Sequence, residues 1–423
     1  MNLLTKLVAR VCAGRQHRVF RTVIARNATV RMLGVGIMLL AIFSAVGKAQ
    51  DASTPSPLPS DSQPIEVEEN AFRGTGARPQ FEAKNQMSKE AELAVGLNRV
   101  VSIPTFTSAF TYREKIYSIK IVGGAPQQAE TTRIGTQIIP ISLVFEGIAD
   151  REGSPILLDP NGIVSKVRNS PNFRNASYET GPTQFGDAVQ RAEFWGSMNQ
   201  DWHTLLEQPR TLTSVTIDVP KGFASVYHVR STDTTFAVVD EGFFISQLNT
   251  ILQFESLDIG ALPIALTTNV LLAPNHDLHQ CCTLGFHTAY GVGRLGNQQF
   301  VQTFAWASWL DTGVFGGTLA DITPLSHEIS EWMNNPFGTN LVPEWQAPNG
   351  GGDCDDVFET GDPMEVFPNS GFPVPIDGFT YHPQTEALLQ WFQRKTPSDA
   401  VHGAFSFPDT TLLTSPSQPC AAH

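Results

Sequence analysis

The strongest chemical signal in the sequence is a histidine and two glutamates within five residues, His327, Glu328 and Glu331. If this stretch is helical, residues four apart lie on one face, so His327 and Glu331 stack and can share a metal ion. Zinc accepts imidazole nitrogens and carboxylate oxygens, and a carboxylate beside the ion can take a proton from water. We therefore expect His327 and Glu331 to be metal ligands and Glu328 to be a general base.

The same stretch also fits a helix without function. Thr323 and Pro324 suit a helix start, and Asn335-Pro336 suits its end. One face is apolar and is formed by Leu325, Ile329, Trp332 and Met333. Polar residues on the opposite face of such a helix are ordinary solvent-exposed positions.

A zinc site needs a third protein ligand, and an acidic loop follows the helix at residues 353–363. Glu359 and Asp362 are its first candidates, ahead of Asp355, Asp356 and Glu344. The loop also fits an exposed acidic segment or a Ca²⁺ site of clustered carboxylates, although it lacks the spacing of an EF-hand.

The residues around the helix carry a family resemblance. His-Glu-x-x-Glu is similar to the His-Glu-x-x-His signature of zinc peptidases, with Glu331 in place of the second histidine. Residues 326–332, Asn335-Pro336 and 359–363 resemble an uncharacterised family of secreted, zincin-like bacterial proteins with a SHEISEW…DP…ExGDP pattern, in which Asn335 replaces the aspartate. The resemblance implies a gluzincin-like metallopeptidase with an acidic third ligand.

The expected order of helices and strands agrees with the zincin layout, in which a helix and several strands precede the metal-binding helix. A helix at 241–254 precedes strands at 262–272, 284–290 and 300–307, and the His-Glu-x-x-Glu helix follows. We therefore predict an α+β fold, with a zincin-like core at 236–423 preceded by a β-rich region at 96–235. The β-rich region should hold strands at 116–122, 138–145 and 215–219 and a helix at 188–206. A strand at 236–239 should follow directly after this region, and a last helix is expected at 383–394.

The N-terminus has the plan of a signal peptide. Residues 1–48 contain eight basic and no acidic residues, and residues 33–46 are apolar. Cleavage after Ala49 would leave residues 50–95, rich in Ser, Pro and Gln, as a disordered linker or prosegment. We expect a secreted protein, extracellular or periplasmic, without stable membrane association; the alternative is an N-terminal membrane anchor.

Charge and cysteines fit export. Removing eight positive charges from a formal net charge of −13 leaves −21, which disfavours a nucleic-acid partner. The mature chain would keep four cysteines, and disulfides are plausible in an exported protein. We expect Cys354 to bond to Cys281 or Cys282, because adjacent cysteines are the least expected pair.

These observations predict a secreted zinc-dependent hydrolase, a metallopeptidase that acts on protein or peptide substrates. One alternative is a non-enzymatic binding or surface protein with a structural metal or none. Another is an enzyme that processes its own residues 50–95.

Other motifs in the sequence are weaker indications of function. Asp311-Thr312-Gly313 matches the catalytic tripeptide of aspartic peptidases, but the sequence has no second copy, so we expect a turn. His276, His279 and His287 are expected in loops or packing, although His287 could assist the site.

Overall fold

The computed structural model describes residues 62–68, 80–315, 318–350 and 354–420. All of them belong to the compact unit from Pro59 to His423. The predicted signal peptide at 1–49 lies outside the described residues. Within them, no helix combines the length and the hydropathy that crossing a membrane requires.

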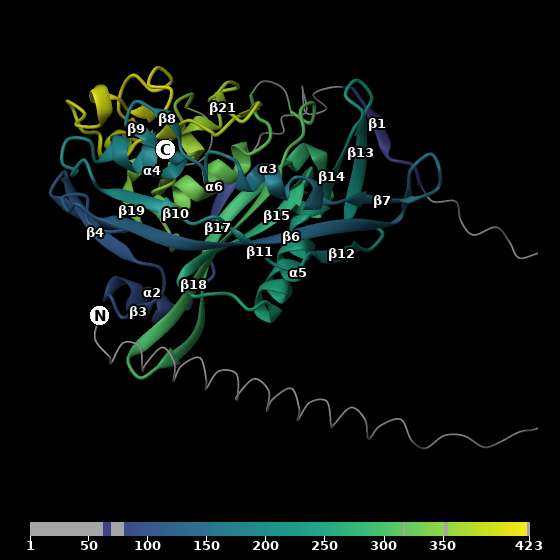
Figure 1. The fold of residues 1–423 in the computed structure, drawn as a ribbon, viewed down its shortest axis with the longest axis horizontal. Helices are drawn as coiled ribbons and strands as arrows, with labels where there is room; N and C mark the ends of the chain where they lie inside the picture. The colour runs from purple at the N-terminus through teal and green to yellow at the C-terminus, as the bar shows by residue number, and fades with distance from the viewer. Residues whose placement is uncertain (1–61, 69–79, 316–317, 351–353, 421–423) are drawn as a thin grey trace, which may run out of the picture. The chain divides into compact units, whose positions relative to one another are not determined.

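A large mixed sheet organises this unit (Figure 1). Its main path runs, in spatial order, through β1 (Ile65–Val67), β13 (Ala224–Val229), β14 (Thr234–Asp240), β16 (Val270–Ala273), β17 (Thr283–Leu295), β18 (Gln298–Trp309), β15 (Ala261–Thr268), β6 (Thr131–Ala149) and β10 (His203–Leu206). Five strands join this path at its sides: β2 (Gln80–Asn85), β3 (Val100–Val101), β7 (Pro155–Leu158), β11 (Arg210–Thr211) and β12 (Val215–Val219).

The centre of the sheet is buried on both faces. Every residue of β15 is buried, and its sequence ALPIALTT is nearly all apolar, as expected for a strand covered on both sides. Side chains alternate between the faces, so Ile264 and Leu266 pack into one core and Ala265 into the other. The neighbouring strand β18 divides in the same way, with Ala305 and Trp306 on opposite faces.

One helix covers each face of this centre. Helix α6 (Thr323–Asn334) packs on one core and α5 (Glu241–Phe254) on the other. Helix α4 (Phe185–Glu193) contacts α6 closely, since a Cβ at Gly186 would be 2.4 Å from Sδ of Met333. The remaining helices are α2 (Lys89–Gly96), α3 (Val164–Arg168) and α7 (Leu389–Gln393).

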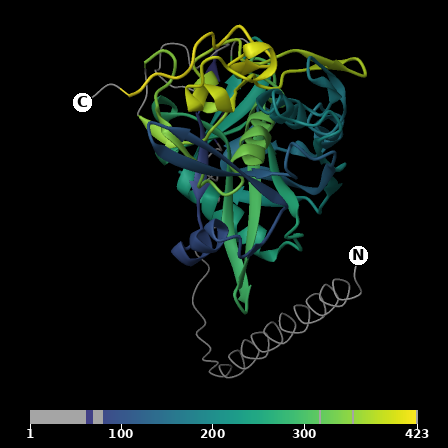
Figure 2. The same cartoon turned by 90° about the vertical axis from the view of Figure 1, so that its left-hand side faces the viewer.

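Smaller two-stranded sheets lie around these layers. They pair β4 (Thr105–Tyr112) with β5 (Lys115–Val122), β8 (Ala176–Tyr178) with β9 (Gly181–Thr183), β19 (Leu341–Trp345) with β20 (Asp355–Val357), β21 (Val374–Ile376) with β22 (Phe379–Tyr381), and β23 (Glu386–Ala387) with β24 (Ser406–Phe407). Figures 1 and 2 show β17 and β18 as a hairpin whose tip points away from the yellow C-terminal segments. Those segments lie next to α6, on the side opposite the hairpin tip.

The predicted zincin-like α+β core is wrong. About 40% of the described residues are in strands and 20% in helices, and these residues form six α-helices and one large curled sheet rather than a helix-rich core. The expected order of α5, the strands and α6 is present. Strand β15, however, pairs with β6, which comes from the region expected to precede the core. Local order does not determine which strands pair across more than a hundred residues.

Three local expectations also differ. The helix expected at 188–206 is α4, which ends at Glu193 and is followed by β10. The helix expected at 383–394 is reduced to α7. Within the expected linker 50–95, β1 pairs with β13, β2 pairs with β17, and α2 begins at Lys89, so ordered structure begins before Val100.

The structure has two disulfides, but their pairing differs from the prediction. Cys354 bonds to Cys420, and the adjacent Cys281 and Cys282 bond to each other. Cys281 and Cys282 are buried in a core with β13, β14 and β16, whereas Cys354 is exposed beside the C-terminal tail. The acidic loop is therefore tied to that tail and not to the strand before α6.

Candidate metal centre

Helix α6 is buried along its whole length. All twelve of its residues are buried, and His327, Glu328 and Glu331 are 0% exposed. The solvent-exposed polar face expected of an ordinary surface helix is therefore absent. Thr323 is the first helical residue rather than the cap, and its hydroxyl lies 2.7 Å from the carbonyl oxygens of both Ala320 and His382, to one of which it can donate.

Three ligand atoms meet on the polar side of α6. Nε2 of His327 lies 3.1 Å from Oε2 of Glu331 and 3.4 Å from Oδ1 of Asp362. Bonds of 2.0–2.2 Å to a tetrahedral ion place neighbouring ligand atoms about 3.3–3.6 Å apart. The two distances from Nε2 of His327 are close to this range, and the three ligand atoms all lie within 4.8 Å of one another. Oε2 of Glu331 and Oδ1 of Asp362 are buried, and apart from Nε2 of His327 neither has a hydrogen-bond donor among the described residues.

Hydrogen bonds on the far side of His327 and Glu331 set the orientation of these two ligands. Nδ1 of His327 donates to Oε1 of Gln384, 3.1 Å away, which turns Nε2 toward Glu331 and Asp362. The backbone N–H of Gly361 donates to Oε1 of Glu331 at 2.9 Å, which leaves Oε2 for a cation. The amide of Gln384 also donates to the carbonyl oxygen of Gly361, so one side chain links both ligands.

Of the two candidates for the third ligand, Asp362 joins His327 and Glu359 does not. Oε1 of Glu359 accepts from the amide of Asn335 at 2.7 Å, and its Oε2 lies 3.8 Å from Nε2 of His287. Glu359 thus lies on the His287 side of Glu331.

The other acidic candidates do not complete a site in the part of the chain that the structure describes. Oδ1 of Asp355 accepts the N–H of Val357. Glu344 groups only with Cys354 and Cys420, whose sulfurs form a disulfide. The expected Ca²⁺ site therefore stays a prediction.

Glu328 is held by His287, a residue for which the sequence showed only a weak signal. Nδ1 of His287 lies 3.1 Å from Oε2 of Glu328, and Nε2 lies 3.1 Å from the carbonyl oxygen of Asn335. A carbonyl oxygen only accepts, so Nε2 carries a hydrogen. Burial lowers the pKa of His287 to about 4 and raises the pKa of Glu328 well above its ordinary value. Without a cation, the acid form of Glu328 therefore donates to Nδ1.

Buried carboxyl groups gather in and around the site without a lysine or arginine partner. Glu193, Glu328, Glu331, Glu359 and Glu386 are all at most 2% exposed, and no Lys or Arg pairs with them among the described residues. Burial raises the pKa of Glu359 and Glu386 well above the ordinary range. An ionised carboxylate in such a place needs a cation.

His327 supplies positive charge when no metal is present. Burial opposes its charge, but the neighbouring carboxylates, Glu331 first and Asp362 next, together outweigh burial and raise the pKa of His327 well above 6.5. Burial also acts to raise the pKa of Glu331, yet the neighbouring His327 brings it to about 2. A divalent cation at Nε2 would replace the proton of His327, as metal binding to histidine generally does.

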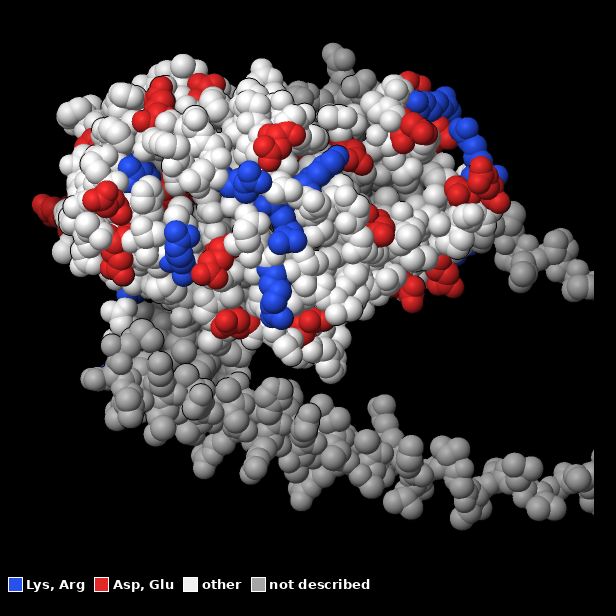
Figure 3. Space-filling view, in the orientation of Figure 1, with Lys and Arg blue, Asp and Glu red and all other residues white. Residues whose placement is uncertain are grey.

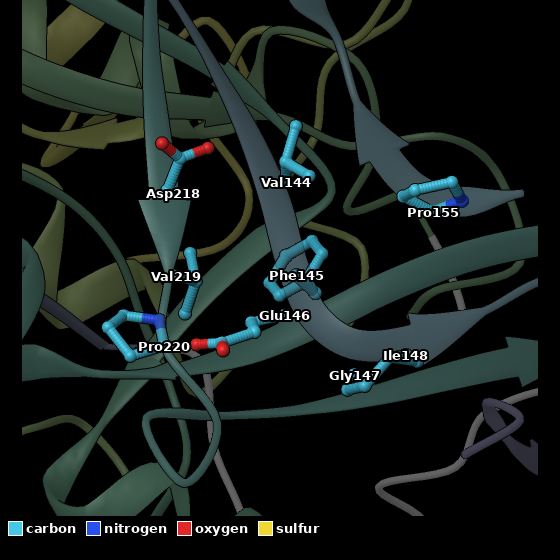
Figure 4. A pocket seen from close by; sticks show the side chains of 9 residues that line it. All are labelled: Val144, Phe145, Glu146, Gly147, Ile148, Pro155, Asp218, Val219 and Pro220. Carbon is cyan, nitrogen blue, oxygen red and sulfur yellow. The ribbon is translucent and has the colours of Figure 1, made fainter. Parts of the chain in front are cut away.

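Of the three ligands, only Asp362 has a partly exposed side chain, although its Oδ1 is buried. The side chain of Asp362 is 20% exposed, whereas those of His327 and Glu331 are 0% exposed. A separate surface hollow of about 360 Å³ lies beside the bend in β6 and is also lined by β7 and β12 (Figure 4). None of the site residues lines it.

The remaining sequence candidates have structural partners. Both carboxylate oxygens of Asp311 accept hydrogen bonds, from the side chains of Asn269 and Trp309. His276 bonds to the hydroxyl of Ser225, and His279 lies in the short helical turn Leu278–Gln280. The structure therefore brings neither Asp311 nor these two histidines into the metal centre.

Comparisons with known proteins do not assign the chain. No protein-family model matches the sequence, and no curated protein or solved structure gives a significant match. The family resemblance stays a prediction, and the function must be argued from the site itself.

Proposed function

We propose that the protein is a metal-dependent hydrolase, with zinc as the expected ion and peptides as the expected substrates. The observation that carries the proposal is the meeting of His327 Nε2, Glu331 Oε2 and Asp362 Oδ1, with the buried carboxyl of Glu328 beside them. Three protein ligands leave one position of a tetrahedral ion open, which is the arrangement of a catalytic zinc site.

The residues divide the chemistry between them. A bound divalent cation lowers the pKa of water and polarises a substrate carbonyl. Oε2 of Glu328 shares one hydrogen with Nδ1 of His287, and this hydrogen must pass to Nδ1 for Glu328 to act as an ionised base. Oε1 has no hydrogen-bond partner among the described residues, so Oε1 is the atom that would take the proton from water. Asp362, the exposed ligand, lies on the side from which water and substrate would enter.

A second function is favoured by one observation. His327, Glu328 and Glu331 are fully buried, which leaves little access for a substrate to an ion held by these residues. The alternative is therefore a binding or surface protein in which the cation only stabilises the fold.

The two proposals give different results with three variants. We expect one zinc per chain in the wild type and in Glu328→Gln, and loss of zinc in His327→Ala and Glu331→Ala. Hydrolysis of a casein-type substrate should fall by about 10²–10⁴-fold in Glu328→Gln, the usual effect of a general base. Zinc binding without hydrolysis in any variant would support the structural role, and absence of bound metal from the wild type would refute both.

The expected setting of this activity remains a proposal too. We propose a secreted enzyme that does not bind nucleic acid. On the face shown in Figure 3, basic side chains form a row at the centre, with acidic side chains on both sides of it. The negative net charge of the whole chain is consistent with a peptide rather than a polyanionic substrate.

A further inference from the structure

We infer that His287 is the positioning residue for Glu328: it fixes Oε2 and thereby leaves Oε1 to act on water. This inference rests on the proposed function, because it assigns to β17 the task of orienting the general base. It concerns residues that the His-Glu-x-x-Glu motif does not contain.

Strand β17 supplies both the space and the hydrogen bond. Gly285 and His287 are two apart and lie on the same face of the strand, toward α6. A Cβ at Gly285 would be 2.7 Å from Oε1 and 2.8 Å from Cγ of Glu328, so only glycine accommodates this side chain. Opposite them on β18 stand Ala307 and Ala305, which are small enough to bring the helix close.

The His287 ring is itself held from the end of α6. Its Nε2–H donates to the carbonyl oxygen of Asn335, and Oδ1 of Asn335 accepts the N–H groups of Thr339 and Asn340. The ring is 0% exposed. Water therefore cannot replace a lost contact, and a rotation of Glu328 would leave two buried polar groups unsatisfied.

Two isosteric substitutions separate the two contacts of the ring. The amide of asparagine occupies the place of Nδ1, and that of glutamine reaches the place of Nε2. His287→Asn therefore keeps the contact to Glu328, whereas His287→Gln keeps the contact to Asn335. Neither places a charge in the core.

Kinetics of the zinc-loaded protein give the first test. We expect His287→Gln to lower kcat about 10²-fold, the cost of misplacing a catalytic group by about 1 Å, with KM and zinc content unchanged. His287→Asn should recover most of that loss, although both variants remove the ring from the core. Equal loss in both variants, with equal loss of stability, would mean that the ring only packs and would overturn the inference.

A measurement without activity tests the contact directly. In the chelator-treated wild type, ¹⁵N spectra of the imidazoles should show His287 with hydrogen on Nε2 and a hydrogen-bonded Nδ1. Glu328→Gln should shift the Nδ1 signal and leave Nε2 in place. An unchanged Nδ1 would overturn the inference.

The remaining outcomes are also decisive. Two zinc ions in the wild type and one in His287→Gln would make His287 a ligand and overturn its positioning role. A wild type that binds zinc and hydrolyses nothing would refute the proposed function and with it the catalytic part of this inference, whereas the spectra would still decide whether His287 holds Glu328.

Discussion

Gly361 leaves no room for a side chain beside the ring of His327, and this gives a sharp test of the metal centre. A Cβ at position 361 would lie 2.3 Å from Nδ1, 2.4 Å from Cε1 and 2.7 Å from Cγ of His327. Ordinary van der Waals contact begins at 3.4 Å, so Gly361→Ala must displace the ring by about 1 Å. The φ angle of Gly361 is −87°, which alanine adopts readily, so the effect comes from contact alone.

The size of the effect follows from how strictly a metal fixes its ligands. Ligand distances vary by only about 0.2 Å, so a ring displaced by about 1 Å no longer binds at Nε2. The substitution also strains the contact with Gln384, and disturbing such supporting residues alone weakens metal binding about 10–100-fold. We expect at least 100-fold weaker zinc binding in Gly361→Ala. The metal-free protein should lose about 1–3 kcal/mol of unfolding free energy through overpacking.

Zinc titration in chelator-buffered solution measures the first quantity, and urea unfolding of the metal-free protein measures the second. Gly96→Ala is the matched control, because nothing lies within 4 Å of a Cβ there and its φ is not positive. It should bind zinc like the wild type. If Gly361→Ala also bound zinc with wild-type affinity, the ring would not lie where the structure places it, and the ligand set would be wrong.

Two further predictions concern stability. Cys420→Ser opens a disulfide between residues 66 apart, and it should lower the free energy of unfolding by up to about 4 kcal/mol. Peptide mapping without reduction should find Cys354 linked to Cys420, and a link from Cys354 to Cys281 would contradict this pairing. Burial raises the pKa of Glu193 well above 4.5, so the folded chain keeps a proton that the unfolded chain loses, and this group destabilises the fold as pH rises above its ordinary pKa. Glu193→Gln should therefore gain stability relative to the wild type between about pH 5 and pH 8 in urea unfolding of metal-free protein, and a difference that does not change with pH would contradict this.

Local periodicity was sufficient for several elements. The helix expected at 241–254 is α5, the strand expected at 215–219 is β12, and the helix that begins at Thr323 is α6. Each has a clear apolar pattern and marked ends. The pairing of β15 with β6, by contrast, depends on tertiary packing, which no local pattern contains.

The site was predictable where its residues share one element. His327, Glu328 and Glu331 follow from helical spacing, and an acidic residue after the helix was expected from the need for a third ligand. The choice of Asp362 over Glu359 depends on the course of a loop. His287 and Gln384 lie 41 and 57 residues from their partners in α6. For His287 a signal existed, since a glycine two residues before a histidine marks a strand face that a helix approaches closely; for Gln384 we find none.

The burial of α6 bears differently on the two proposed functions. Carboxylates buried without basic partners favour a cation whether or not the protein is an enzyme. A structural cation held by His327, Glu331 and Asp362 has no use for a further buried carboxyl, and burying one is costly. Glu328 is nevertheless given room by Gly285 and a hydrogen bond by His287, while its Oε1 is left without a partner among the described residues. This arrangement, together with the coordination position that the three ligands leave open, is the reason to prefer hydrolysis.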